Sequence, residues 1–185
     1  MRLAGRHTSD RLRCWQICVG LALALCSGRA SALTLAAMPL EELTRSASLV
    51  VRARCIDRQV TRTPDGRIAS LARFAVVEAA KGSAPGVVTV RELGGRSGDT
   101  ELVVPGAPLS EPGDEVVLFL EPLEGDVLGV VGLALGYMPV AVLPGSGATV
   151  HLSRTLGNVA ARGSVRPVAE LLDAVRRIDA QQGGR

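Results

Sequence analysis

Glycine and proline divide the region from residue 125 to residue 147 into pieces of only a few residues. Proline removes a backbone donor and glycine is unfavourable inside a helix, so a long helix cannot run through this region. Short apolar pieces between such residues are typical of β-strands joined by turns. The interruptions are Gly125, Gly129, Gly132, Gly136, Pro139, Pro144, Gly145 and Gly147. The pattern predicts strands over residues 128–131, 138–143 and 148–152.

The preceding region gives stronger strand signals. Residues 48–56 alternate apolar and polar side chains, which predicts a half-buried strand. A turn is expected at residues 63–66, where Pro64 presets φ and Gly66 accepts the left-handed conformation, so residues 68–78 should return as the second strand of a hairpin. Further strands are expected over residues 87–93, 102–104 and 115–120, and a flexible loop over residues 94–99. Six or more short strands predict a mainly β fold, either a small barrel or a sandwich.

Two helices are expected to flank these strands. A short helix should begin near Pro39, because proline and two following acids suit the first turn of a helix. An amphipathic helix is expected over residues 167–180, and residues 181–185 should form a disordered tail. Its apolar face consists of Val168, Leu171, Leu172, Val175 and Ile178.

The N-terminus has the three parts of a secretory signal. A basic opening is followed by an uncharged run of 15 residues, 14–28, and then by the small residues Ala30, Ser31 and Ala32. A membrane-spanning helix needs about 20 residues, so we predict cleavage after Ala32 and a mature chain that begins at Leu33. An uncleaved anchor or a buried helix is the alternative. Lipoprotein signals place a small residue before the modified cysteine, whereas Leu25 precedes Cys26, so we expect no lipid there.

Removal of residues 1–32 changes the charge and the cysteine content. The predicted signal contains five of the 21 basic residues and one of the 18 acidic residues, which leaves 16 basic and 17 acidic residues. The mature chain therefore lacks the basic excess that nucleic acid binding requires. Three of the four cysteines leave with the signal, and Cys55 cannot form an internal disulfide alone. Since Cys55 lies in an expected strand, we expect a small buried side chain; a reactive thiol or an intermolecular bridge is the alternative.

Residues 127–150 contain no charged side chain and could suggest a membrane span. Proline and glycine interrupt this stretch, and a spanning helix must satisfy its backbone over about 20 residues. Buried strands are therefore expected, and no membrane span after removal of the signal.

Two stretches resemble a known family. Leu49-Val50-Val51-Arg52-Ala53-Arg54, and the end of the second strand at Lys81-Gly82, are similar to the opening hairpin of netrin-like domains, a group that includes the tissue inhibitors of metalloproteinases. Residues 104–120 are similar to a group of uncharacterised secreted bacterial proteins, and the likeness extends from about Leu43 to Val140. The resemblance implies a five- to six-stranded barrel of the oligonucleotide/oligosaccharide-binding (OB) type, with a short N-terminal and one C-terminal helix, over residues 33–180.

The resemblance does not extend to the inhibitory residues. The animal inhibitors chelate the protease zinc through an N-terminal cysteine, whereas this mature chain is expected to begin at Leu33 with no cysteine near it. The likeness therefore concerns the fold and not the activity.

Few residues of the mature chain can support catalysis or metal binding. His151 is its only histidine, and with Cys55 it supplies too few ligands for a zinc site. His151 with Ser153 lacks a nucleophile elbow, and a pair of Cys55 with His151 is the remaining catalytic alternative. The acidic clusters lack the spacing of a calcium loop, and the glycine-rich stretch at residues 94–99 lacks a phosphate-binding motif. We therefore expect no catalytic residue, no metal and no cofactor.

The sequence favours an exported, periplasmic or secreted, binding module whose partner is another envelope or extracellular protein. Single-stranded nucleic acid is not expected as a ligand, because OB-type barrels bind it with aromatic platforms, and only Phe74, Phe119 and Tyr137 remain after Trp15 leaves with the signal. A protease-inhibitor-like domain that acts through loops is one alternative. An enzyme that uses Cys55 or His151 is the other.

Overall fold

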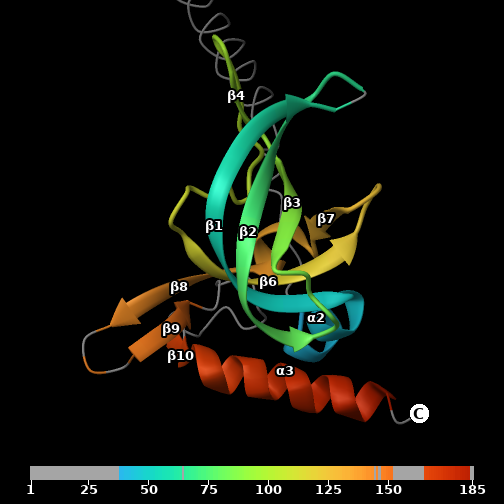
Figure 1. Cartoon of the computed structure of the whole chain (residues 1–185), viewed down its shortest axis with the longest axis vertical. Coiled ribbons are helices and arrows are strands. Elements are labelled where there is room, and N and C mark those ends of the chain that lie inside the picture. Colours follow the sequence, from blue (N-terminus) through green and yellow to red (C-terminus); the bar gives the residue numbers. More distant parts are fainter. Residues whose placement is uncertain (1–37, 64, 144, 146, 152–164, 184–185) are drawn as a thin grey trace, which may run out of the picture. The chain divides into compact units, whose positions relative to one another are not determined.

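The computed structural model describes residues 38–183 except residues 64, 144, 146 and 152–164, and the described residues belong to one compact unit. The expected cleavage site at Ala30, Ala32 and Leu33, and Cys26, lie outside the described residues. The fold is mainly β, with one short helix before the strands and a longer helix after them (Figure 1). The elements are α2 Leu40–Ser46, β1 Leu49–Arg62, β2 Ile68–Lys81, β3 Val87–Leu93, β4 Gly95–Ser97, β5 Thr100–Leu102, β6 Glu115–Pro122, β7 Val127–Val130, the 3₁₀ helix η1 Leu133–Gly136, β8 Tyr137–Leu143, β9 Gly147–His151, β10 Val165–Pro167 and α3 Val168–Gly183.

Eight strands form one sheet in the order β1-β2-β3-β7-β6-β8-β9-β10. Because β1 also pairs with β6, five strands of this sheet form a partial ring. The β3–β7 pairing is parallel, and the other pairings in the ring are antiparallel. The ring places strands from both halves of the chain next to one another.

The strand number was underestimated: the sequence pattern predicted six or more strands and the resemblance implied a barrel of five or six, whereas the described residues contain ten strands. The sheet continues beyond the ring through β8, β9 and β10, and β4 pairs with β5 in a separate two-stranded sheet. Strands β4, β5 and β10 have three residues each. Three residues are too few for an alternating pattern to be recognised.

The prediction of a flexible loop over residues 94–99 was wrong. These residues contain β4 and lead into β5, and Ser70 Oγ donates a hydrogen bond of 2.9 Å to the carbonyl oxygen of Gly94. A Cβ atom on Gly95 would lie 2.6 Å from Ser70 Oγ, and the φ of Gly95 is 130°. Glycine is therefore required here for a close approach between backbone and side chain rather than for flexibility.

Two apolar cores lie on the two faces of the ring. The inner core fills the ring and contains Leu49, Val51, Ala53, Cys55, Ala72, Phe74, Val88, Val90, Val116, Leu118 and Leu120. The outer core joins β1 and β6 to the helices and β9, and it contains Leu43, Ala47, Val50, Val117, Phe119, Val131, Leu135, Met138, Val150, Val168, Leu171, Leu172 and Val175. Because both faces of β6 are covered, residues 116–120 are all buried.

The two helices contact each other at one end of the strands, and β4 lies toward the other end (Figure 1). Lys81 at the end of β2 links them, since its Nζ donates to the carbonyl oxygen of Thr44 at 2.7 Å and lies 3.5 Å from Asp179. Helix α3 ends at Gly183, three residues beyond the predicted end and within the stretch expected to be a disordered tail.

Residues 127–143 form β7, η1 and β8, followed by β9, and not one long helix. No helix in the described part of the chain is long and apolar enough to cross a membrane.

Candidate functional site

Strand β3 presents two different surfaces on successive residues. Val88, Val90 and Glu92 are buried on the inner face of the ring, whereas Arg91 and Leu93 lie on the outer face. This division follows from the two-residue period of a strand. Glu92 is therefore a charged residue on the face of β3 that is otherwise apolar and buried.

Glu92 is only 3% exposed, and both of its carboxylate oxygens accept hydrogen bonds from Ser110. The backbone N–H of Ser110 donates to Oε2 at 3.0 Å, and the hydroxyl group of Ser110 donates to Oε1. The hydroxyl oxygens of Ser110 and Tyr137 lie 3.1 Å apart. A hydroxyl group has one proton, so Tyr137 can donate to Ser110 while Ser110 donates to Glu92.

Burial controls the ionisation of this cluster. It raises the pKa of the Glu92 carboxyl group, although the hydrogen bonds from Ser110 and the charge of Arg58 act in the opposite direction. Burial raises the pKa of Tyr137 to about 12. Burial and the negative charge of Glu92 raise the pKa of the Cys55 thiol, so this thiol stays protonated at neutral pH.

The geometry of the cluster suits a structural role. Ser110 is 0% exposed and Cys55 is 1% exposed, so neither possible nucleophile presents a surface to a substrate. The double hydrogen bond instead fastens the segment that connects β5 to β6 onto the end of β3. Cys55 is a buried free cysteine on β1, as the sequence predicted.

The structure does not place Cys55 and His151 on neighbouring strands. Cys55 lies on β1 and His151 on β9, and β6 and β8 separate these two strands. The side chain of His151 and the whole of Ser153 lie outside the described residues. Within the described residues, no group of three or more His, Cys, Asp or Glu side chains is arranged to hold a metal ion.

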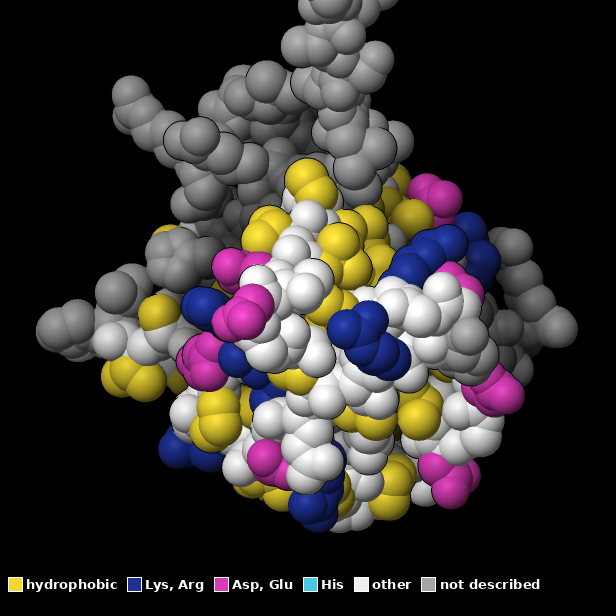
Figure 2. Space-filling model, turned by 90° about the horizontal axis from the view of Figure 1, so that it is seen from above, with side chains coloured by type: hydrophobic (Ala, Val, Ile, Leu, Met, Phe, Trp, Pro, Cys, Tyr) yellow, Lys and Arg dark blue, Asp and Glu magenta, His cyan; other side chains and the backbone are white. Residues whose placement is uncertain are grey.

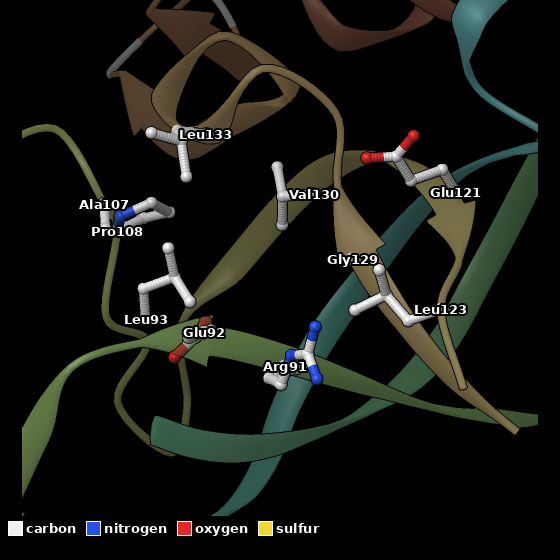
Figure 3. A pocket seen from close by; sticks show the side chains of 10 residues that line it. All are labelled: Arg91, Glu92, Leu93, Ala107, Pro108, Glu121, Leu123, Gly129, Val130 and Leu133. Atoms are coloured by element: carbon white, nitrogen blue, oxygen red, sulfur yellow. The ribbon is translucent and has the colours of Figure 1, made fainter. Parts of the chain in front are cut away.

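The outer face of β3 borders a cavity of about 140 Å³ (Figure 3). Its walls are mostly apolar, and its charged residues are Arg91, Glu92 and Glu121. The apolar lining consists of Leu93, Ala107, Pro108, Leu123, Gly129, Val130 and Leu133. These residues come from β3, β7, η1 and two connecting segments, so the cavity depends on the folded ring.

A second cavity, of about 430 Å³, adjoins the first one, because Arg91 and Leu93 line both. The turn between β1 and β2 and the start of β2 form one side of it, and Leu102 and Val104 form another. We refer to the two cavities together as the β3 groove. Figure 2, which looks down on the molecule, shows hydrophobic side chains gathered between basic and acidic ones.

Strand register separates Arg91 and Glu121, two charged residues of the smaller cavity. Arg91 is paired with Gly129 across β3 and β7, and Gly129 is paired with Glu121 across β7 and β6. Arg91 and Glu121 are thus two strand spacings apart, about 10 Å. A Cβ atom on Gly129 would lie 3.0 Å from Leu123 Cδ1, so this glycine leaves room for the leucine that forms the wall. Among the described residues, Arg91 has no ion-pair partner.

A larger hollow of about 620 Å³ lies beside Tyr137, but its charged residues already have partners. Glu115 forms ion pairs with Arg52 and with Arg54, the latter at 3.0 Å. Asp114 accepts a hydrogen bond of 2.8 Å from the backbone N–H of Glu111. The β3 groove is the stronger candidate for a binding site because it combines apolar walls with a guanidinium group that has no ion-pair partner among the described residues.

None of the residues Arg91, Glu92, Ser110 and Tyr137 was predicted from the sequence to belong to a functional site or a buried polar cluster. One signal was present, since Glu92 continues the two-residue series of Val88 and Val90. A charged residue in the buried phase of a strand indicates a partner elsewhere in the chain. The partner, Ser110, lies 18 residues away in an irregular segment, where no periodic pattern could identify it.

Comparison with protein-family models and with curated proteins finds no match to this chain.

Proposed function

We propose that this chain is an exported, non-enzymatic binding module that holds another envelope or extracellular protein in the β3 groove. The observation that carries this proposal is the composition of the groove, in which Arg91 has no ion-pair partner among the described residues and stands beside apolar walls. Val103, between two lining residues of the larger cavity, is 71% exposed. An exposed apolar surface next to an unpaired charge is typical of a protein-binding site.

The order of the ring supports an OB-like barrel as the underlying fold. In that fold, ligands bind on the face of the second and third strands and beside two loops. The β3 groove includes residues of β2 and β3, of the turn between β1 and β2, and Leu123 of the β6–β7 connection. The position of the groove therefore agrees with a binding role.

The residues of the groove favour a protein over single-stranded nucleic acid. Arg67 is already paired with Asp65 at 2.8 Å, and the smaller cavity also contains Glu92 and Glu121. None of the described residues that line the two cavities is aromatic. Nucleic acid binding depends on continuous basic surface and stacking platforms, which this groove does not offer.

Burial of the potential nucleophiles supports the non-enzymatic part of the proposal. Cys55 and Ser110 are enclosed in the ring, and the Cys55 thiol has a raised pKa because of its burial. An activated thiol needs the opposite, a lowered pKa and access to substrate.

Export is proposed from the basic start, the uncharged run and the small residues before Leu33. N-terminal sequencing or intact mass of protein from a native-type host should show the loss of residues 1–32. Retention of Met1, or a diacylglyceryl group on Cys26, would contradict this part of the proposal.

Partner capture with two matched variants tests the binding site. Leu93→Arg places a charge in the groove, whereas Val142→Arg makes the same kind of change on β8, at a side chain that is 78% exposed and lines neither cavity. The mature wild-type protein and each variant are used separately to recover proteins from envelope extract after crosslinking. We expect Leu93→Arg to lose a partner that both the wild type and Val142→Arg retain. Equal recovery by both variants, or turnover of a substrate without any specific partner, would contradict the proposal.

A further inference from the structure

We infer that the β3 groove recognises a carboxylate group next to an apolar side chain of about the size of leucine. This inference rests on the proposed function, because it names the chemistry of the partner at the same site. The carboxylate group can be the C-terminus of the partner or an acidic side chain within it, and both sources supply the same chemistry.

The size and the lining of the smaller cavity select the apolar group. The cavity measures about 140 Å³, and an engineered apolar cavity of about 150 Å³ binds benzene. Leu93, Leu123 and Leu133 line it from three different segments, and no aromatic side chain contributes. A branched aliphatic side chain fits this volume and contacts aliphatic walls on several sides.

Arg91 selects the charge of the neighbouring group. Its guanidinium group lines both cavities and has no ion-pair partner among the described residues. A planar guanidinium group matches a carboxylate group in a bidentate hydrogen-bonded pair, which gives both affinity and orientation. The guanidinium group and the apolar cavity are adjacent, so one ligand residue can contact both.

The other charged groups around the groove fix the orientation of the ligand. Glu121 lies two strands from Arg91, on the other side of Gly129 (Figure 3), and repels a second anion there. Glu92 has both oxygens bonded to Ser110, and burial favours its neutral form. Asp65 and Arg67 in the larger cavity are paired with each other. Arg91 is therefore the position at which an incoming carboxylate group is favoured.

Small probes of defined chemistry test this inference on the mature protein. The probes are N-acetyl-leucine, its amide, N-acetylglycine and the amide of N-acetyl-leucyl-glutamate, titrated while backbone N–H chemical shifts are followed by NMR. At a binding free energy of about −0.3 kcal/mol per non-hydrogen atom, ligands of this size bind with about millimolar dissociation constants. We expect N-acetyl-leucine to change the backbone N–H chemical shifts of the protein around Arg91, Leu93 and Gly129. Its amide and N-acetylglycine should each bind about fivefold more weakly.

Two matched arginine variants provide the control. Arg91→Gln should weaken binding of N-acetyl-leucine about fivefold and abolish its advantage over the amide. Arg73 is an exposed arginine of β2 that lines neither cavity. Arg73→Gln should therefore change neither the affinity for N-acetyl-leucine nor its advantage over the amide. Tighter binding of N-acetyl-leucine than of the dipeptide amide identifies a C-terminus as the source, and the reverse order identifies an acidic side chain.

Three results would overturn the inference: equal binding of acid and amide, an equal effect of both arginine variants, or no shifts in the groove at about 20 mM probe. If Leu93→Arg still abolishes partner capture in any of these cases, the proposed binding site is retained and only the inferred carboxylate ligand is wrong. If capture is unaffected by Leu93→Arg, the proposed site itself is wrong.

Discussion

Glu92 and Arg91 are neighbours on β3, yet they differ in burial and in their partners. Glu92 lies on the inner face, is 3% exposed and has both carboxylate oxygens bonded to Ser110. Arg91 lies on the outer face, lines two cavities and has no ion-pair partner in the part of the chain described. The difference shows how one strand can separate stability from recognition: a buried carboxyl group with hydrogen-bond partners holds the fold, and a charge without an ion-pair partner among the described residues is available to a ligand.

Replacing each neighbour by alanine should give the largest difference. Glu92→Ala leaves the N–H and hydroxyl groups of Ser110 buried without their acceptor, so the free energy of unfolding should fall by about 2 kcal/mol or more. Arg91→Ala removes no ion pair of the described residues and should change the free energy of unfolding by less than about 0.5 kcal/mol. Urea unfolding of the mature protein measures both values. Equal losses of unfolding free energy in the two variants would show that the faces of β3 do not separate stability from recognition.

The pH dependence of the free energy of unfolding reports the ionisation of Glu92. Because burial raises its pKa in the folded state, the folded protein binds this proton more tightly than the unfolded chain does. The resulting stability is fully present below the unfolded pKa, about 4.3, and is lost as the pH rises through the folded pKa. Glutamine mimics the protonated side chain, so Glu92→Gln should match the wild type at pH 4 and be more stable at pH 8. A wild-type advantage that grows with pH would contradict this assignment.

Tyr137 should give the smallest effect in the cluster. Tyr137→Phe removes one hydroxyl group that lies 3.1 Å from Ser110 Oγ, at an expected loss of about 1 kcal/mol. As the chain has one tyrosine, phenolate absorbance reports its ionisation directly. The pKa should be about 12 in the folded protein and about 10 in urea. Titration near pH 10 in the folded protein would place the hydroxyl group in solvent and outside the network.

The elements with long, regular patterns were predictable from sequence. Residues 87–93 form β3 with the predicted bounds, and the predicted strand over residues 115–120 lies within β6. Strand β1 continues to Arg62, six residues beyond its predicted end, because backbone pairing with β2 extends the strand through polar residues that show no apolar alternation. The start of β1 was therefore easier to predict than its end.

The candidate site was not predictable in the same way. The β3 groove brings Leu93, Pro108 and Leu123 together from segments that are distant in sequence, and no motif links them. Residues 94–99 were expected to form a loop because glycine was interpreted as flexibility, whereas Gly95 has a positive φ and packs against Ser70. Local patterns identify which face of a strand is buried, but the partners across a ring follow only from its topology.

A paired measurement on Arg91→Gln and Glu92→Gln decides whether these two neighbours on β3 divide recognition from stability. Each variant is assayed both for binding of N-acetyl-leucine and for its free energy of unfolding at neutral pH. We expect Arg91→Gln to lose about fivefold in affinity with a stability change below about 0.5 kcal/mol, while Glu92→Gln retains the affinity and shifts the stability. A loss of affinity in Glu92→Gln as large as that in Arg91→Gln, with stability unchanged in both, would contradict this division.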